Sequence, residues 1–346
     1  MKVLHMLQSD RFSGAENVVC QIISMLEDTE IEFVYSSQDG QIREALRERN
    51  IKFNPVNRIS ISEFKRVIAE EKPDIIHAHD MKASFFAALS CGKIPLISHI
   101  HNNNFDSRGL TIKSILYSLA ATKAKKIIWV SDSAYKGYYM HEKFKNKSEV
   151  LYNIINIEQL KIKASADTNH YTYDIVYLGR ITDQKDPMRL LKVLKCVQQC
   201  KGDIRVAIIG TGDLEVETKN YANELGLHNN VEFLEFQSNP YKILQESKCM
   251  VMTSKWEGLP MCALESLALG VPVVSTPTDG LKYIIQDGEN GYLSDDDQVL
   301  SEKLLKIVCE ENLHEKLSEG ALDLARKKMN IEEYRKKMIS IYNGVK

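Results

Sequence analysis

Two permanent cations lie close together in the segment from Tyr177 to Pro187. Gly179 and Arg180 follow an apolar run directly, and Lys185 comes five positions after Arg180. A guanidinium binds phosphate as a fork and an ammonium binds it as a point charge, so the pair could hold a diphosphate. Gly179 would remove side-chain bulk beside it. Two solvated surface cations are the competing interpretation, and the spacing alone does not decide between them.

Two carboxylates lie eight positions apart in the segment 256–266. Glu257 falls in a predicted loop, and Glu265 falls on a helix that Pro260 can begin. Carboxylates accept hydrogen bonds from sugar or ribose hydroxyls, and the free N–H groups of a helix start can hold a phosphate. A structural role for Glu265, in capping, is the alternative.

Two glycine turns also occur between a predicted strand and a predicted helix. Gly210 and Gly212 form a short turn that could pass close to a nucleotide, but no third spaced glycine completes a dinucleotide-binding fingerprint. Gly14 could let backbone approach an anion at a helix start. An ordinary turn glycine is the simpler interpretation of Gly14.

Histidines follow two of the predicted strands. His77 and His79 have the spacing of a metal-binding pair, but no third ligand is evident, so we predict no metal site. We expect His99 to point away from His101 and leave its role open.

Short apolar runs alternate with amphipathic stretches, which predicts parallel sheets covered by helices. We expect strands near 2–7, 31–35, 74–78, 95–100, 127–130 and 149–151, then 173–179, 204–209, 231–234, 249–252 and 272–275. The polar stretch 163–170 interrupts the alternation and is the best linker candidate. The fold class is therefore α/β, with two tandem doubly wound, Rossmann-like domains over 1–165 and 166–346 and a central cleft between them. The last helix could cross back to the first domain.

Composition limits the function. The chain has 346 residues, 44% of them hydrophobic and 27% charged, which indicates an ordered protein with two cores. A net charge of −2 argues against a general nucleic-acid partner. The seven cysteines include no CxxC pair and are expected to be small buried hydrophobes in a reducing compartment.

No apolar run approaches the roughly 18 residues that a membrane span needs, so a cytoplasmic location is expected. An aromatic and basic cluster at Tyr138, Tyr139, Lys143, Phe144, Lys145 and Lys147 could make peripheral contact with the inner face of the cell membrane. An ordinary exposed helix end is the alternative.

Taken in order, these pieces resemble the GT-B retaining glycosyltransferases of family 4 over nearly the whole chain. The matching pieces are Gly14-Ala15-Glu16, His101, Gly179-Arg180 with Lys185, Gly210-Thr211-Gly212, Glu257 with Glu265, Asp279-Gly280, and Asp287-Gly288 with Gly291. The family often has two glycines where this chain has Ser13-Gly14, and an Asn-Gly pair where it has Asn153-Ile154.

The resemblance implies a role for each matching residue. Arg180 and Lys185 would neutralise the donor diphosphate, and Glu265 would hold the ribose. Glu257 and the backbone of Gly258, Leu259, Met261 and Cys262 would contact the transferred sugar and its phosphate. His101 would touch the sugar near the reacting carbon, Gly14 would approach the β-phosphate, and Gln237 with its neighbours would line the base.

The implied reaction is transfer of a hexose or N-acetylhexosamine, with retention and without a metal or other cofactor. The donor would be a nucleotide-sugar, most often a UDP-sugar, and the acceptor a glycan or lipid-linked saccharide of bacterial surface-polysaccharide synthesis. A sugar-nucleotide epimerase of the same architecture and a non-enzymatic two-lobed sugar-binding protein are the alternatives. A nicotinamide-dependent oxidoreductase lacks its glycine fingerprint here, and a phosphorylase would need a lysine-bound pyridoxal phosphate.

Overall fold

The first half of the chain forms a sheet of six parallel strands in the computed structural model, which describes residues 1–102 and 107–346. The strands are β1 (Lys2–Met6), β2 (Glu32–Ser36), β3 (Ile75–His79), β4 (Leu96–Ile100), β5 (Lys126–Trp129) and β6 (Ser148–Val150). Their order across the sheet is β2-β1-β3-β4-β5-β6. The central strands are buried on both faces, as parallel strands covered by helices must be.

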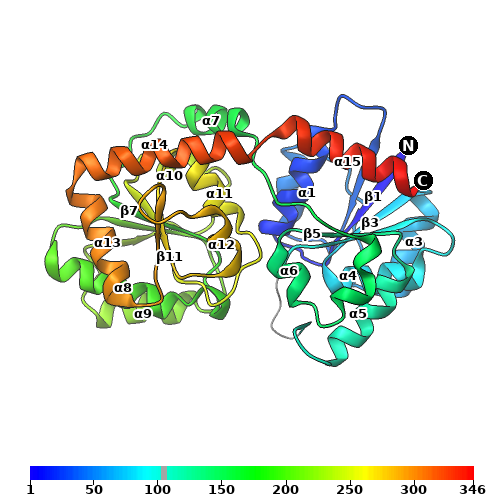
Figure 1. Cartoon of the computed structure of the whole chain (residues 1–346), viewed down its shortest axis with the longest axis horizontal. Helices are drawn as coiled ribbons and strands as arrows, with labels where there is room; N and C mark the ends of the chain where they lie inside the picture. The colour runs from blue at the N-terminus through cyan, green and yellow to red at the C-terminus, as the bar shows by residue number, and fades with distance from the viewer. Residues whose placement is uncertain (103–106) are drawn as a thin grey trace. The chain divides into compact units, whose positions relative to one another are not determined.

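Helices cover both faces of this sheet, with α1 and α15 on one side and α4 and α5 on the other (Figure 1). The elements are α1 (Gly14–Met25), α2 (Ile42–Arg47), α3 (Ile61–Glu71), α4 (Asp80–Ser90), α5 (Ile112–Lys123), α6 (Asp132–Gly137), the 3-10 helix η2 (His141–Lys147) and α15 (Ile331–Val345).

The second half repeats the plan with another sheet of six parallel strands. These are β7 (Ile175–Leu178), β8 (Val206–Ile209), β9 (Val231–Phe233), β10 (Cys249–Met252), β11 (Val273–Ser275) and β12 (Gly291–Leu293). Their order is β12-β11-β10-β7-β8-β9. The prediction of two doubly wound α/β sheets is confirmed.

The helices of this half also lie on both faces of their sheet, with α8 and α9 on one side and α10 and α11 on the other (Figure 1). They are α7 (Ile157–Ala166), η3 (Asp183–Lys185), α8 (Pro187–Cys200), α9 (Glu215–Glu224), α10 (Tyr241–Gln245), α11 (Met261–Ala268), α12 (Asp279–Ile284), α13 (Asp297–Cys309) and α14 (Glu311–Lys328).

The chain divides into two compact units, one of Met1–Asn153 with Ile331–Lys346 and the other of Ile154–Asn330. The division precedes the boundary expected at 165 because α7 packs against α10 and α11 of the second unit. Lys163–Ala166, placed in the linker by the sequence pattern, form the last turn of α7. The terminal helix α15 belongs to the first unit, where Tyr342 is fully buried.

Each sheet has a point at which the strand order reverses. In the first unit it lies between β1 and β3, and in the second between β7 and β10. Ligands of doubly wound sheets bind beyond the carboxyl ends of the strands at such points. The residues that follow these four strands are therefore the ones to compare with the predicted site.

Two expectations about localisation can be compared with the structure. None of the helices within residues 1–102 and 107–346 combines the length and apolar character that a membrane span requires. All seven cysteines are free thiols, but the expectation that they are buried is wrong for Cys196, Cys200 and Cys309. These three lie on exposed positions at helix ends and in helix α8.

Candidate functional site

A buried ion pair joins the two strands at the reversal point of the second sheet. Lys185 lies in the turn after β7, Glu257 lies in the loop after β10, and Lys185 Nζ is 2.5 Å from Glu257 Oε1. Both side chains are about nine-tenths buried, with exposed fractions of 11% and 7%. The sequence pattern predicted that both residues lie at the site. It did not predict that their side chains form an ion pair.

Hydrogen bonds hold the two loops around this ion pair in a fixed register. Thr253 Oγ1 donates to the carbonyl oxygens of Lys185 and Asp186 at 3.1 and 3.0 Å. Gln184 Nε2 donates to the carbonyl oxygen of Trp256 at 2.9 Å, and the Lys255 N–H donates to the carbonyl oxygen of Gln184 at 2.8 Å. The position of the ammonium is therefore set by both loops together.

The charges of Lys185 and Arg180 have different surroundings. Burial lowers the pKa of Lys185, but the adjacent Glu257 carboxylate more than offsets this and holds that pKa above its ordinary value. Arg180 is exposed, and it forms no ion pair with any residue in the described ranges. Arg180 is thus a cation whose charge remains available to a bound anion.

The glycines of this edge are required by the chain's own packing. A Cβ on Gly210, whose φ is +135°, would lie 2.0 Å from the carbonyl oxygen of Gly179. A Cβ on Gly179 would lie 3.2 Å from the Tyr177 hydroxyl and 3.8 Å from Lys185 Cε. The turns at Gly179 and Gly210 therefore lie against each other and leave room for the lysine side chain.

The loop before α11 presents an uncapped helix start. Gly258 and Leu259 are buried, and Pro260 is the N-cap residue, one position before the helix it was predicted to begin. Pro260 supplies no side-chain acceptor to the N–H groups of the first turn, at Met261 and Cys262. An anion can fill that role.

A helix that the sequence pattern missed packs against this loop. The segment Asp279–Ile284 forms α12, and Gly280 lies so close to Gly258 that an added Cβ would be 1.7 Å from the Gly258 carbonyl oxygen. Only glycine permits this approach. The Asp279-Gly280 pair therefore has a packing role next to the predicted site.

Glu265 is buried on α11 and accepts a hydrogen bond from the Tyr241 hydroxyl at 3.3 Å. Cys262 lies between the charged groups: burial raises the pKa of its thiol to about 12, the Lys185 ammonium opposes that shift, and the carboxylates of Glu257 and Glu265 add to it. The thiol is therefore protonated at neutral pH and is not a nucleophile.

The segment predicted to line a base is exposed. Gln237 Nε2 donates to the carbonyl oxygen of Leu234 at 2.7 Å, and the side chain of Phe236 is 52% exposed. The N–H of Gly210 donates to the carbonyl oxygen of Glu235 at 2.7 Å, which places this segment beside the turn after β8.

In the first unit, Gly14 is the first residue of α1, at the reversal point of that sheet. An added Cβ there would meet no described atom within 4 Å, so local packing does not require glycine at this position. The preceding Ser13 donates its hydroxyl to Glu16 Oε2 at 2.5 Å, which fixes the helix entry.

His101 belongs to a column of five imidazoles that the sequence pattern did not predict. His5 Nδ1 lies 2.8 Å from His79 Nε2, and His79 Nδ1 lies 2.8 Å from His101 Nε2. The expectation that His99 points away from His101 is wrong, because their ring centroids are 4.2 Å apart. The expectation that His77 and His79 lack a third ligand is also wrong, since His5 offers a ring nitrogen within 4.8 Å of theirs.

All five imidazoles are neutral at physiological pH. Burial lowers the pKa of His5 to about 3, with a smaller contribution from His101. Burial also lowers the pKa values of His77, His79, His99 and His101, and in His101 the Asp80 carboxylate partly opposes the shift. Each ring therefore has one N–H donor and one acceptor nitrogen.

The predicted aromatic and basic cluster is only partly exposed. Tyr138 is fully buried and Phe144 is 5% exposed, because both rings pack into the core of the first unit. Lys147 Nζ donates to the carbonyl oxygens of Thr122 and Ala124 at 2.9 Å. These three side chains complete the core and the end of α5, whereas Tyr139 and Lys145 are 56% and 71% exposed.

Family profiles match almost the whole chain. The profile described as "Glycosyltransferase Family 4" matches residues 12–159, and the one described as "Glycosyl transferases group 1" matches residues 158–323. The two matches meet in α7 and together include Gly14, His101 and every residue of the site in the second unit.

Individual relatives are similar at moderate identity. An uncharacterized glycosyltransferase of Methanocaldococcus jannaschii is 28% identical over 308 residues, which cover 74% of this chain and 76% of that protein. The UDP-Gal:alpha-D-GlcNAc-diphosphoundecaprenol alpha-1,3-galactosyltransferase of Escherichia coli is 23% identical over 327 residues, 85% of this chain and 84% of its own.

Solved structures share the fold. Anabaena HepE, crystallised in complex with UDP and glucose, aligns with a TM-score of 0.85 at 18% identity over 99% of this chain and 100% of its own. Its complex with UDP-glucose aligns with the same TM-score, identity and coverage.

Proposed function

We propose that this chain, which belongs to the glycosyltransferases of the GT-B fold, transfers a hexose or N-acetylhexosamine from a UDP-sugar to a glycan or lipid-linked saccharide. The proposal depends on the charged groups at one edge of the second sheet, which we call the cationic edge. There the exposed Arg180, the buried Lys185–Glu257 pair and the uncapped start of α11 follow adjacent strands at the reversal point. This arrangement suits a diphosphate with a hydroxyl-bearing group on either side.

The names of similar proteins support the choice of donor and acceptor. The E. coli relative is named for UDP-Gal and for a diphosphoundecaprenol-linked acceptor. A Campylobacter jejuni relative, 30% identical over 193 residues, is also named for a diphospho-undecaprenol acceptor. HepE was crystallised with UDP-glucose. We therefore propose bacterial surface-polysaccharide synthesis as the setting.

The proposed mechanism uses fixed positive charge. When the sugar–phosphate bond breaks, negative charge grows on the β-phosphate, and Arg180, Lys185 and the start of α11 would stabilise it as it develops. No metal ion takes part in this scheme. The departing phosphate would accept the proton of the acceptor hydroxyl on the same face of the sugar, which retains the anomeric configuration.

The remaining assignments follow the site. Glu265 would accept hydrogen bonds from the ribose hydroxyls, and Glu257 with the backbone of Gly258 to Cys262 would contact the sugar and phosphate. Gln237 would lie along the base. Gly14 and His101 of the first unit would contact the β-phosphate and the sugar.

The test is transfer by the purified chain in buffer with excess EDTA. UDP-, GDP- and ADP-sugars would each be supplied with a synthetic lipid-diphosphate saccharide, and the anomeric configuration of the product would be read by NMR. Product from a UDP-sugar with retained configuration supports the proposal. An absolute requirement for added Mg²⁺ or Mn²⁺, or an inverted product, contradicts the mechanism.

Gly14→Ala separates a ligand contact from a folding role. The added methyl meets no described atom within 4 Å, and alanine favours a helix over glycine, so we expect an unchanged or slightly higher melting temperature. A methyl where the β-phosphate should approach is expected to lower kcat/KM on the order of tenfold or more. Steady-state kinetics and thermal unfolding measure the two effects.

Gly344→Ala in α15 is the matched control, because its added methyl also meets nothing within 4 Å. We expect it to keep parental kinetics. Parental kinetics for Gly14→Ala itself would remove Gly14 from the donor site.

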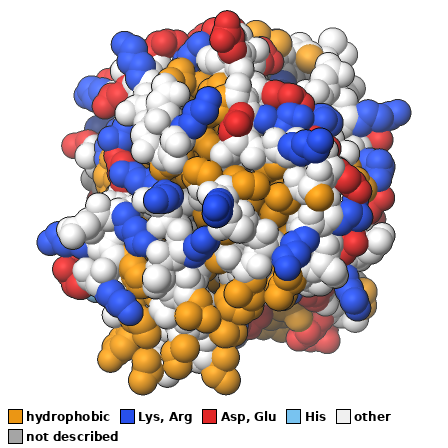
Figure 2. All heavy atoms as spheres, turned by 90° about the vertical axis from the view of Figure 1, so that its right-hand side faces the viewer, with side chains coloured by type: hydrophobic (Ala, Val, Ile, Leu, Met, Phe, Trp, Pro, Cys, Tyr) orange, Lys and Arg blue, Asp and Glu red, His pale blue; other side chains and the backbone are white. Residues whose placement is uncertain are grey.

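We propose α5 as the site of peripheral membrane contact, because Tyr138 and Phe144 of the predicted cluster are buried. Five large apolar side chains are exposed along α5 and the turn before it: Leu110, Ile112, Ile115, Leu116 and Leu119. Residues 107–125 contain four Lys or Arg and no Asp or Glu. Hydrophobic side chains gather at the lower end of the face in Figure 2, at the height where Figure 1 draws α5, with basic side chains nearby. An apolar stripe among cations suits an anionic bilayer surface.

Replacing two side chains of this stripe should abolish most of the membrane binding. Ile112 and Leu119 are 77% and 54% exposed, so Ile112→Glu with Leu119→Glu removes apolar contact without opening the core. We expect affinity for vesicles containing phosphatidylglycerol to fall at least about tenfold. Co-sedimentation with the vesicles measures this affinity. Val216→Glu, at a 73% exposed position on α9, is the control, and equal sedimentation of all three proteins would exclude α5 as the contact.

A further inference from the structure

The five histidines of the first unit share one face of its sheet because of strand geometry. Residues two apart on a strand face the same side, as His77 and His79 do on β3. The parallel register sets His5 of β1 beside His77 and His99 of β4 beside His79. His101 continues the line just beyond β4. The column therefore starts at the reversal point of the sheet, between β1 and β3.

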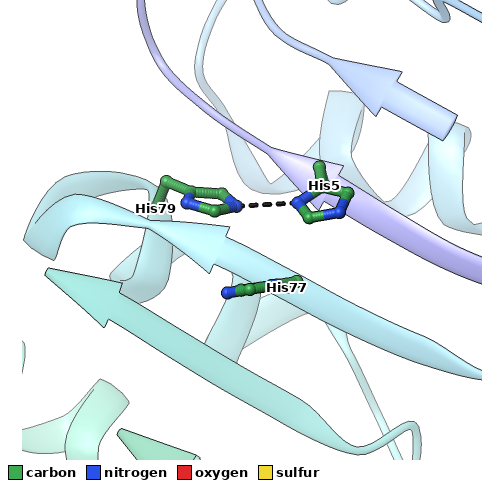
Figure 3. Close-up of side chains that lie close together, drawn as sticks. All are labelled: His5, His77 and His79. Atoms are coloured by element: carbon green, nitrogen blue, oxygen red, sulfur yellow. Dashed lines mark hydrogen bonds between the residues drawn. The ribbon is translucent and has the colours of Figure 1, made fainter. Parts of the chain in front are cut away.

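Three of these rings bring ligand nitrogens together. His5, His77 and His79 are all buried, and each offers a ring nitrogen within 4.8 Å of the other two (Figure 3). Within the two described ranges, His5 Nε2 and His77 Nε2 have no hydrogen-bond partner. A buried polar atom left unpaired is costly, so a ligand that uses His77 Nε2 would stabilise the fold.

Two of the three rings are oriented by hydrogen bonds to residues that would not bind the ion, as metal-binding histidines usually are. His77 Nδ1 lies 3.0 Å from the Tyr342 hydroxyl of α15, and this leaves His77 Nε2 for a ligand. His79 Nδ1 lies 2.8 Å from His101 Nε2, so His79 Nε2 faces His5. In metal sites the second ring nitrogen is normally held by such a partner, which fixes the ring's orientation.

The chemistry of the donor set selects the ion. Neutral imidazoles bind Zn²⁺ and its late first-row neighbours, whereas Mg²⁺ and Ca²⁺ require oxygen ligands. Two Zn–N bonds of about 2.0–2.1 Å at a tetrahedral angle separate the nitrogens by about 3.3 Å. The contact between His5 Nδ1 and His79 Nε2, now 2.8 Å, would thus open by about 0.5 Å.

We propose that His5, His77 and His79 form a binding site for one late first-row divalent metal ion, with Zn²⁺ as the reference ion. The ion lies between His5 Nδ1 and His79 Nε2, whose shared proton moves to a ring nitrogen that does not bind the ion, and it adds His77 Nε2 as a third ligand. A water molecule or His99 fills the fourth position. The site ties β1, β3 and, through Tyr342, α15 together, and all of these elements belong to the first unit.

Metal uptake by the untagged full chain tests the site directly, because a histidine tag would itself bind the ion. The chain is stripped with EDTA, dialysed against Zn²⁺ or Co²⁺, and analysed by mass spectrometry for metal content. We expect one ion per chain, the visible absorption of tetrahedral Co²⁺, and a higher melting temperature with Zn²⁺. A chain that takes up no stoichiometric ion overturns the proposal and leaves these rings joined by shared protons.

Variants assign the ion to this set of ligands. His77→Gln should weaken Zn²⁺ binding at least on the order of 100-fold, and Tyr342→Phe, which removes only the hydroxyl that orients His77, roughly 10- to 100-fold. His170→Gln removes an exposed imidazole from the second unit and should bind as the parent does. Circular dichroism checks folding, and Tyr342→Phe remains informative if a ligand variant does not fold.

A second pair of variants separates two overlapping sets of rings. His79, His99 and His101 also have ligand nitrogens within 4.8 Å of one another. Loss of binding in His99→Gln together with full binding in His5→Gln would overturn the assignment. All measurements are made without a nucleotide-sugar, so their outcome is independent of the proposed function.

Discussion

Arg180→Ala is expected to fold normally and to lose roughly a hundredfold in turnover, which corresponds to about 3 kcal/mol of transition-state stabilisation. Arg180 is exposed and has no ion-pair partner among the residues described, so its removal should change the free energy of unfolding by less than about 0.5 kcal/mol. The charge that it is proposed to face grows as the donor bond breaks. Its loss should therefore lower kcat more than it raises KM.

Two variants control this measurement. Arg180→Lys keeps the charge but loses the guanidinium fork, and it should recover part of the turnover. Arg326→Ala removes a 70% exposed arginine from the same unit and should have parental kinetics. Near-normal turnover in folded Arg180→Ala would show that the diphosphate assignment is wrong.

The strands were predictable because each is a short apolar run with its own local signal. The six runs expected in the first half coincide with β1 to β6 within two residues at each end. In the second half β12 was missed, because its three residues begin at Gly291, with φ of +157°. An added Cβ there would lie 2.0 Å from the carbonyl oxygen of Val273. That requirement comes from the neighbouring strand and is invisible in the local pattern.

The site was predictable to the extent that it depends on strand ends. Polar residues that follow parallel strands share one edge of a sheet, so Arg180, Lys185 and Glu257 could be expected near one another. The pairing of Lys185 with Glu257 spans 72 positions and depends on how the two loops pack, which spacing does not specify. The histidine column likewise needed the register between β1, β3 and β4 in addition to the alternation within each strand.

The surface was the least predictable part. Tyr138 and Phe144 lie among lysines in the sequence, but their rings face the core, as their burial shows. The exposed apolar residues of α5 lie in a pattern that equally suits a buried helix. Which face of a helix is covered depends on its neighbours, so composition alone did not show that Tyr138 and Phe144 are buried while the apolar residues of α5 are exposed.

Lys185→Ala is expected to destabilise the second unit by about 3–5 kcal/mol, because it leaves the Glu257 carboxylate buried without its partner. Thermal and urea unfolding should show this loss, whereas Arg180→Ala should not. Lys185→Ala alone is therefore a poor test of catalysis, since lower activity would combine unfolding with the loss of a phosphate contact.

The double variant Lys185→Met with Glu257→Gln separates the two effects. Removing both charges avoids the unpaired carboxylate, so we expect stability within about 1–2 kcal/mol of the parent and a large coupling energy in the double-mutant cycle. If the pair serves the donor phosphate and sugar, this stable protein should still be nearly inactive. If Lys185→Ala is as stable as the parent, the ion pair contributes nothing to folding. If the double variant has normal turnover, the ion pair takes no part in the reaction. A stable but inactive double variant would show that this buried ion pair is retained for chemistry, because an uncharged pair of similar size folds as well.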